Sequence, residues 1–220
     1  MTCMRLAILI GFLASAIACA APLVQTGHLH DYGALQPVDT GNGVVWHLQR
    51  QPELTPPNVL YIAPVSYAAP PVIRPSLEQE VSALLRERLY VHALRILAPR
   101  LIIIKSKDTD DYAEIGHTVD TLSVAITHVT RGNGLLRYVI GFGMGDAALQ
   151  VEGVMSNAQT DEPLIELAVR IPHGGYPSMG INPRAISARH CLRLATDAAC
   201  HDIIQALAAL WQLTEEETAK

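Results

Sequence analysis

The sequence predicts a mixed α/β fold, in which a mixed sheet with an antiparallel meander is packed by an amphipathic helix and a C-terminal helix. Three observations support this fold class. In the first half, short runs rich in β-branched residues are bounded by prolines. Two stretches carry apolar residues at helical spacing. Between residues 121 and 171, alternating segments follow one another at short intervals, which is typical of an antiparallel meander.

The first strand and the first long helix are predicted on either side of a proline-rich stretch. Residues 58–64 are β-branched and aromatic and end at a proline, as a strand often does. Ser76 can cap the helix that follows, with Gln79 as the reciprocal partner of a capping box. One face of this helix carries the apolar residues Leu77, Val81, Leu84, Leu85 and Leu89.

The middle of the chain predicts further strands. A continuous apolar run over residues 101–105 predicts a strand that is covered on both faces. A short helix is expected over residues 109–116. Strict alternation in the next segment places Val129 on the opposite side from Leu122. The four strands of the meander are expected over residues 121–129, 135–140, 147–155 and 164–171.

The last helix is predicted over residues 196–213, with Thr196 as its N-cap, and residues 214–220 are expected to be a solvated acidic tail. Its start matters for Cys191 and Cys200, a candidate disulfide pair in an oxidising compartment. On one unbroken helix these cysteines would stand about 13 Å apart, beyond disulfide reach. A bridge therefore requires a helix that begins after Cys191. The alternative is two small buried side chains in a longer helix.

Residues 1–18 have the pattern of a signal peptide, because Arg5 precedes an apolar stretch that ends in small residues. The segment ending at Cys19 is similar to the bacterial lipobox, in which the cysteine is acylated and becomes the mature N-terminus. Ala16 stands where lipoboxes usually carry a large aliphatic residue, so a plain cleavage site is the alternative. We therefore expect an outer-membrane lipoprotein that faces the periplasm. If Cys19 is not acylated, we expect a soluble periplasmic protein.

Residues 19–57 are expected to be a tether, and residues 58–213 a single domain. Only four side chains between residues 20 and 58 are charged, and Pro, Gly, Asn and Thr interrupt the stretch. A short strand is a candidate over residues 43–48. The rest of this stretch would lift the domain off a surface.

Charge and motif spacing argue against several kinds of ligand. The formal net charge of −5 disfavours nucleic acid, because phosphate binding needs a basic face. Gly141, Gly143 and Gly145 lack the spacing and the following helix of a dinucleotide-binding loop, so we expect structural glycines and no cofactor. His28 and His30 form the closest metal-ligand pair, but no further ligand is visible, so no metal is expected.

No catalytic constellation is visible in the sequence. It has no Gly-x-Ser-x-Gly elbow, no His-Glu-x-x-His motif and no cysteine beside an activating base. The aspartates at 108, 110 and 111 are expected to be a solvated turn. We therefore expect a protein that is not an enzyme.

Residues 137–145, followed by an alternating strand through Val151 and Val154, resemble the family filed as domain of unknown function 4410. The similarity is best over residues 117–170. The order of strand, helix and strand before residues 119–124 also looks like small envelope domains of bacterial lipoproteins. These include the TolB amino-terminal type, the curli-secretion lipoprotein and the penicillin-binding-protein activators. The resemblance implies a mixed α/β domain that often belongs to a lipoprotein, with no known activity or catalytic residue.

Together these observations predict an accessory or scaffold protein of the cell envelope. It would act through protein–protein contact with an envelope machine, and with the membrane through a lipid on Cys19. The alternative is a periplasmic binding module for a small ligand or cell-wall fragment, using the loop around residues 173–176. A hydrolase with a dispersed site is the third class.

Overall fold

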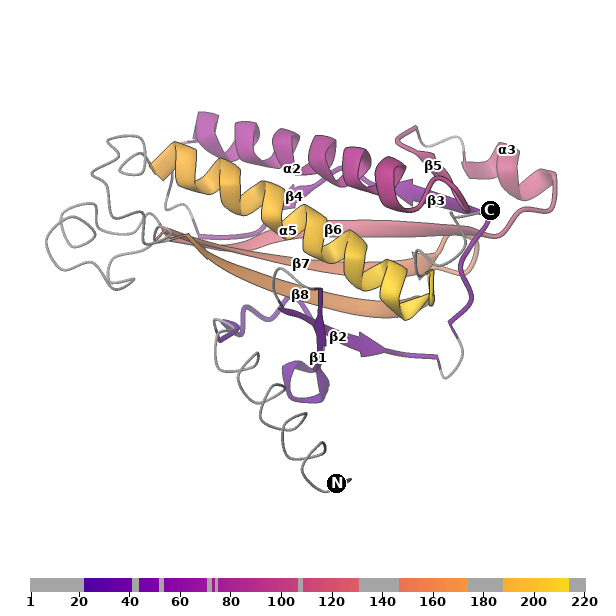
Figure 1. Ribbon diagram of the computed structural model, residues 1–220, viewed down its shortest axis with the longest axis horizontal. Helices are drawn as coiled ribbons and strands as arrows, with labels where there is room; N and C mark the ends of the chain where they lie inside the picture. Colours follow the sequence, from indigo (N-terminus) through magenta and orange to yellow (C-terminus); the bar gives the residue numbers. More distant parts are fainter. Residues whose placement is uncertain are drawn as a thin grey trace, which may run out of the picture.

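The computed structural model describes residues 22–40, 44–51, 54–70, 73, 75–106, 109–130, 147–173 and 188–213. One sheet runs through this part of the chain, and two long helices lie on one of its faces (Figure 1). Residues 22–35, ahead of the first strand, lie on the other face. The expected mixed α/β fold is therefore confirmed.

Among the described residues, the sheet has eight strands: seven follow the order β1-β2-β8-β7-β6-β3-β5, and β4 pairs with β6. Strands β6, β7, β8, β2 and β1 pair antiparallel, whereas β3 pairs parallel with both β5 and β6. The mixed sheet with an antiparallel meander is thus confirmed, and the strand expected over residues 135–140 lies outside the described residues. The strands are β1 (Gln36–Asp39), β2 (Val44–Gln49), β3 (Val59–Ile62), β4 (Ser66–Tyr67), β5 (Ile102–Ile104), β6 (Val119–Thr130), β7 (Ala147–Asn157) and β8 (Pro163–His173).

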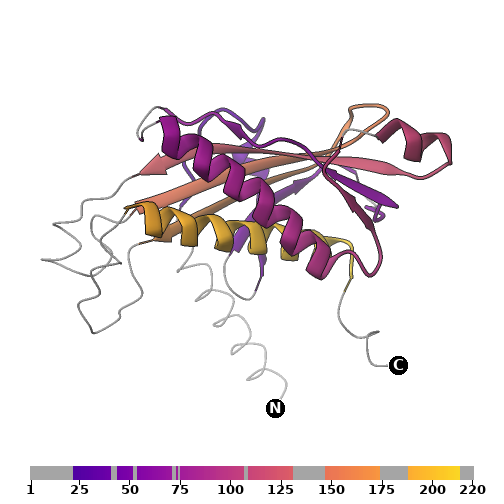
Figure 2. The same cartoon turned by 90° about the horizontal axis from the view of Figure 1, so that it is seen from above.

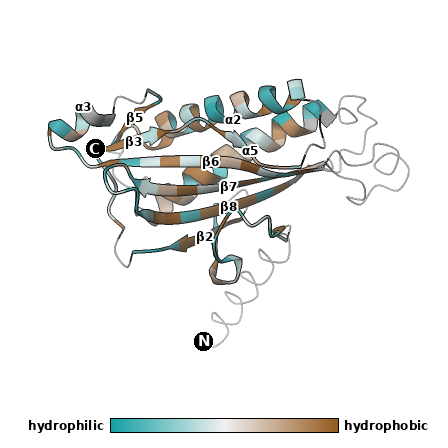
Figure 3. Cartoon of the chain, turned by 180° about the vertical axis from the view of Figure 1, so that it is seen from behind, coloured by the Kyte–Doolittle hydropathy of each residue, from teal (hydrophilic) through white to brown (hydrophobic). Residues whose placement is uncertain are grey.

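The main core lies between the sheet and the helices α2 (Pro75–Ile96) and α5 (Ala188–Leu210), which lie side by side (Figure 2). The short helix α3 (Thr109–Glu114) follows β5, as expected. Hydrophobic residues recur along β7 and β8, which are brown in places in Figure 3. The predicted apolar face of α2 is confirmed for Val81, Leu85 and Leu89, which are buried together with Ala93.

Both long helices begin earlier than the sequence predicts. Helix α2 begins at Pro75, so Ser76 lies inside the first turn and does not cap it. Proline suits this position because its missing N–H would have no partner there. Helix α5 begins at Ala188, and the predicted cap Thr196 is buried inside it. The Thr196 hydroxyl donates a hydrogen bond to the Leu192 carbonyl oxygen at 2.7 Å, a bond that forms within a helix rather than at its start.

Residues 22–40 and 44–51, predicted as part of a tether, belong to the folded domain. Strand β2 pairs with β8, and β1 pairs with β2, so this part of the chain adds two strands to the sheet. The candidate strand over residues 43–48 is confirmed as β2. Ahead of β1, Leu29 packs near Ala168 in a second, smaller core on the face away from the helices. The tether prediction is therefore wrong for the described part of this segment.

Two strands differ from prediction in how their side chains are exposed. Strand β5 is at the edge of the sheet and Ile102 is 43% exposed, so this strand is not covered on both faces. In β6 the pairing with β7 shifts between Ile126 and His128. This β-bulge places Val129 in the same core as Leu122, although alternation predicts opposite sides.

Candidate functional site

Three polar side chains are buried on the face of the sheet away from the helices. They are Gln150 and Glu152 on β7 and Glu166 on β8, and each residue is at most 1% exposed. The register pairs Glu152 with Ala168 and Val154 with Glu166, so the two glutamates are diagonal neighbours on adjacent strands. Buried carboxylates need hydrogen-bond donors, so the segment that covers them must supply these.

Glu152 is held by neutral donors. The Tyr32 hydroxyl donates to Oε2 at 2.8 Å, and Gln150 Nε2 donates to Oε1 at 2.6 Å. The Thr26 hydroxyl lies 3.0 and 3.1 Å from the two carboxylate oxygens and 2.8 Å from the Tyr32 hydroxyl. Two donors from the residues before β1 therefore satisfy a carboxylate in the middle of the sheet.

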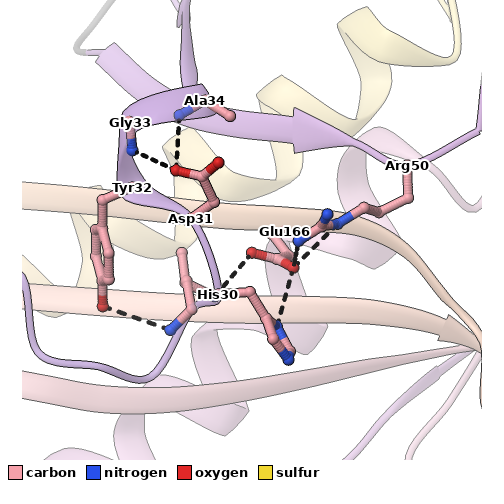
Figure 4. Close-up of polar contacts among 8 residues, drawn as sticks. His30, Asp31, Tyr32, Gly33, Ala34, Arg50 and Glu166 are labelled. Atoms are coloured by element: carbon pink, nitrogen blue, oxygen red, sulfur yellow. Dashed lines mark hydrogen bonds and ion pairs between the residues drawn. The ribbon is translucent and has the colours of Figure 1, made fainter.

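Glu166 is held by a positively charged donor, the guanidinium group of Arg50. Arg50, which directly follows β2, donates to Oε1 from Nε at 3.1 Å and from Nη2 at 2.5 Å. The His30 ring Nδ1 lies 3.3 Å from the same oxygen, and the His30 backbone N–H donates to Oε2 at 3.3 Å (Figure 4). One buried carboxylate thus connects β8 to the end of β2 and to the segment before β1.

We call residues 22–35 the N-terminal strap, because hydrogen bonds fasten this segment along the sheet. Arg170 Nη1 donates to the Pro22 carbonyl oxygen at 2.8 Å. The Gln150 side chain accepts a bond from the Val24 backbone N–H at 2.8 Å and donates to the Val24 carbonyl oxygen at 2.7 Å. The side-chain amide of Gln150 therefore pairs with the strap as a neighbouring strand would.

The strap is also held by a turn and by apolar packing. Asp31 caps the 3-10 helix η1 (Tyr32–Ala34), since its Oδ1 accepts bonds from the backbone N–H groups of Gly33 and Ala34 (Figure 4). Leu29 and Leu35 are buried against the sheet on either side of this turn. The strap is thus a folded part of the domain.

The arrangement holds a segment of the chain against the sheet. Both glutamates are buried and already bonded, whereas a general acid or nucleophile must reach a substrate. Within the described ranges, no group of three or more His, Cys, Asp and Glu side chains could hold a metal ion. No helix in the same part of the chain is long and apolar enough to cross a membrane.

Several predicted features lie outside the described residues and stay predictions. His173 ends β8, and the rest of the predicted ligand loop follows it. These features are the signal peptide 1–18, the lipidation site Cys19, the glycines Gly141, Gly143 and Gly145, the loop residues 174–176 and the tail 214–220.

The candidate disulfide between Cys191 and Cys200 is wrong. Because α5 begins at Ala188, both cysteines lie on one continuous helix, about 13 Å apart along its axis. Cys200 is free and fully buried, and its Sγ lies 3.4 Å from the Leu85 carbonyl oxygen on α2. Burial raises the pKa of the Cys200 thiol well above its usual value. Cys200 is therefore a packing residue between the two helices.

Sequence reasoning missed Gln150, Glu152 and Glu166. A strand prediction assigns alternate residues to solvent, so polar residues at these positions fit an exposed face. The pattern that could have revealed them lies in the strap, where Thr26 and Tyr32 bring hydroxyl donors into a stretch with few charges. Matching these donors to particular carboxylates requires the folded chain.

Comparison with solved structures finds distant similarity. A PelC dodecamer from Paraburkholderia phytofirmans shares 10% identity, with a TM-score of 0.42 over 76% of this chain and 96% of that chain. A DUF330 protein from Xanthomonas campestris shares 12% identity, with a TM-score of 0.42 over 74% and 90%. The lipoprotein GNA1162 from Neisseria meningitidis shares 9% identity, with a TM-score of 0.32 over 57% and 86%.

The family comparison confirms the resemblance that the sequence suggests. No curated protein matches the chain. The matched segment, residues 107–170, contains α3, β6, β7 and most of β8, and it includes the buried residues Gln150, Glu152 and Glu166. Over this segment the chain matches the family Domain of unknown function (DUF4410).

Proposed function

We propose that this protein is an exported envelope lipoprotein, anchored through Cys19, that acts by contact with another envelope protein and not by chemistry. Its domain is held close to the membrane, with the helix layer turned toward the partner.

The observation that carries this proposal is the position of the strap. The chain is bonded to the sheet from Pro22 onward, through Arg170 and then through Gln150. Only two residues lie between Cys19 and Pro22, and the three chain steps from Cys19 to Pro22 span about 11 Å at most when extended. A lipid on Cys19 therefore keeps the strap-bearing face near the bilayer, because the chain between the lipid and the folded domain is short.

The surface for partner contact is the helix layer, which lies on the opposite face of the sheet (Figure 1). Among the described residues, three large apolar side chains of this layer are between 41% and 47% exposed. Burying such side chains in a protein interface is favourable by about 25 cal/mol per Å² of apolar area. They are Val91 and Leu94 on α2 and Leu194 on α5.

Site-specific photo-crosslinking in cells tests this proposal. A photoreactive residue at Leu94 is expected to give a discrete adduct with one envelope protein. The same residue at His28, which is exposed on the strap, is the control and is expected to give none. An adduct from Leu94 that disappears in the Cys19→Ser variant would also show that anchoring is needed. If Leu94 gives no adduct, or the same adducts as His28, the contact function is rejected.

A further inference from the structure

We propose that the domain also binds a small primary amine, in a cavity where β6 begins and β7 ends, with Asp120 as the group that receives the ammonium. This site lies outside the strap and does not depend on the proposed envelope contact.

The cavity has a volume of about 240 Å³. Three pieces of chain line it: the segment before β3, the start of β6, and the turn between β7 and β8. Its walls combine the apolar side chains Leu54, Pro56 and Leu164 with the polar side chains Asn157 and Glu162. The volume is below the 300–1,000 Å³ or so that is usual for drug-sized ligands, so the ligand is small.

Asp120 is unusual in this cavity because its carboxyl group is buried without a hydrogen-bond partner among the described residues. It is 5% exposed, and within the described residues no hydrogen bond or ion pair reaches its carboxyl group. Glu152, Glu166 and Asp202, the other buried acidic residues, all accept hydrogen bonds, Asp202 from the Thr40 hydroxyl at 2.9 Å. Half-buried Glu78 also has a carboxylate oxygen without a partner among the described residues, but Glu78 does not line the cavity. An unpaired buried carboxylate is costly, so an acceptor left open at a cavity points to a donor that arrives with a ligand.

The acidic side chains that line the cavity favour a cationic ligand. Asp120 and Glu162 are the charged side chains among the described lining residues, and both are acidic. Two neighbouring polar groups are already in use: the Thr118 hydroxyl bonds to Asn58, and Asn157 Oδ1 accepts bonds within its own turn. The Asp120 carboxyl group can therefore accept hydrogen bonds from a cation. An ammonium supplies donors, and the apolar walls suit a short methylene stem.

The pKa of Asp120 supports this reading, because burial raises it to about 6. At neutral pH the cavity therefore holds an ionised carboxylate that has no partner cation among the described residues. The amine is expected to bind more tightly at pH 7.5 than at pH 5, where Asp120 is protonated.

Calorimetric titration of the mature protein with 1,4-diaminobutane tests the site. We expect saturable binding at pH 7.5, no binding of the neutral 1,4-butanediol, and at least a tenfold loss of affinity in the Asp120→Asn variant. Asp161→Asn is the matched control: Asp161 lies in the adjacent turn with φ of 58°, a conformation that asparagine tolerates. This variant removes the same charge without altering the described lining and is expected to bind as the wild type does.

A second probe, Nα-acetyl-lysine amide, distinguishes a free amine from a lysine side chain of a polypeptide. Preference for the diamine assigns the site to a free amine, and preference for the lysine derivative assigns it to a peptide. The proposal is overturned if neither probe binds. It is also overturned if Asp120→Asn, with an unchanged circular dichroism spectrum, binds as tightly as the wild type or if Asp161→Asn weakens binding equally.

Discussion

At the residue scale, three buried carboxyl groups differ in the hydrogen-bond donors that contact them. Glu152 receives bonds from neutral hydroxyl and amide donors, whereas Glu166 receives a guanidinium. Asp120 has neither within the described residues, and its pKa is raised to about 6 by burial. The first two carboxylates bind a segment of the chain itself, and the third is free to bind a ligand.

The substitution Tyr32→Phe tests whether the donors to Glu152 hold the strap. It removes the hydroxyl that donates to a buried carboxylate at 2.8 Å, so the free energy of unfolding should fall by about 1–3 kcal/mol. Urea denaturation at pH 7 measures this loss. The control is Tyr112→Phe, which should change stability by less than about 0.5 kcal/mol because Tyr112 is a partly buried residue of α3. Equal stability of both variants would contradict the role given to Tyr32.

The substitution Asp120→Asn tests the raised pKa. The native state binds the Asp120 proton more tightly than the unfolded state, so the free energy of unfolding falls as pH rises between about 4 and 6. The Asp120→Asn variant has no titrating group at this position, so its free energy of unfolding lacks this pH dependence. It should match the wild type near pH 4 and be more stable above pH 7 by about 2–3 kcal/mol in the absence of ligand. A stability difference that is the same at pH 4 and pH 7.5, measured by urea denaturation, would show that burial does not raise this pKa.

At the element scale, helix α2 has one face in the core and another in solvent. Leu89 is fully buried, whereas Val91, two residues further along, is 42% exposed. Leu89→Ala should lower the free energy of unfolding by about 2–5 kcal/mol, because it leaves a cavity between α2 and the sheet. Val91→Ala should change it by less than about 0.5 kcal/mol, as is usual for surface positions. Similar losses in the two variants, compared by urea denaturation, would mean that the helix faces are wrongly assigned.

The elements that could be predicted from the sequence are those whose pattern is local. The spacing of Val81, Leu85 and Leu89 predicts the inner face of α2, and alternation predicts β7 and β8. The strap could not be predicted, because its donors lie 120 residues or more from Glu152 and Glu166 along the chain.

The ligand cavity could not be predicted for a similar reason. Asp120 resembles an ordinary polar residue near the start of a strand. Its burial depends on the segment before β3 and on the turn after β7, which meet it only in the folded chain. Local sequence patterns carry no information about contacts between segments that are far apart in the sequence.

At the scale of the whole molecule, the two faces of the sheet have separate tasks in the proposed function. One face carries the strap, which ties the start of the domain to Glu152 and Glu166. The other face carries α2 and α5 and is open to a partner (Figure 1). An anchor three residues before the strap would hold the domain close to the membrane, so the partner should also lie near it.

Mass spectrometry of the mature N-terminus tests this account most directly. Protein purified from the membranes of a Gram-negative bacterium should lack residues 1–18 and begin at a Cys19 that carries a diacylglyceryl group. An N-terminal peptide that begins at an unmodified Cys19, or after Ala20, would contradict the anchor and with it the proposed orientation of the domain.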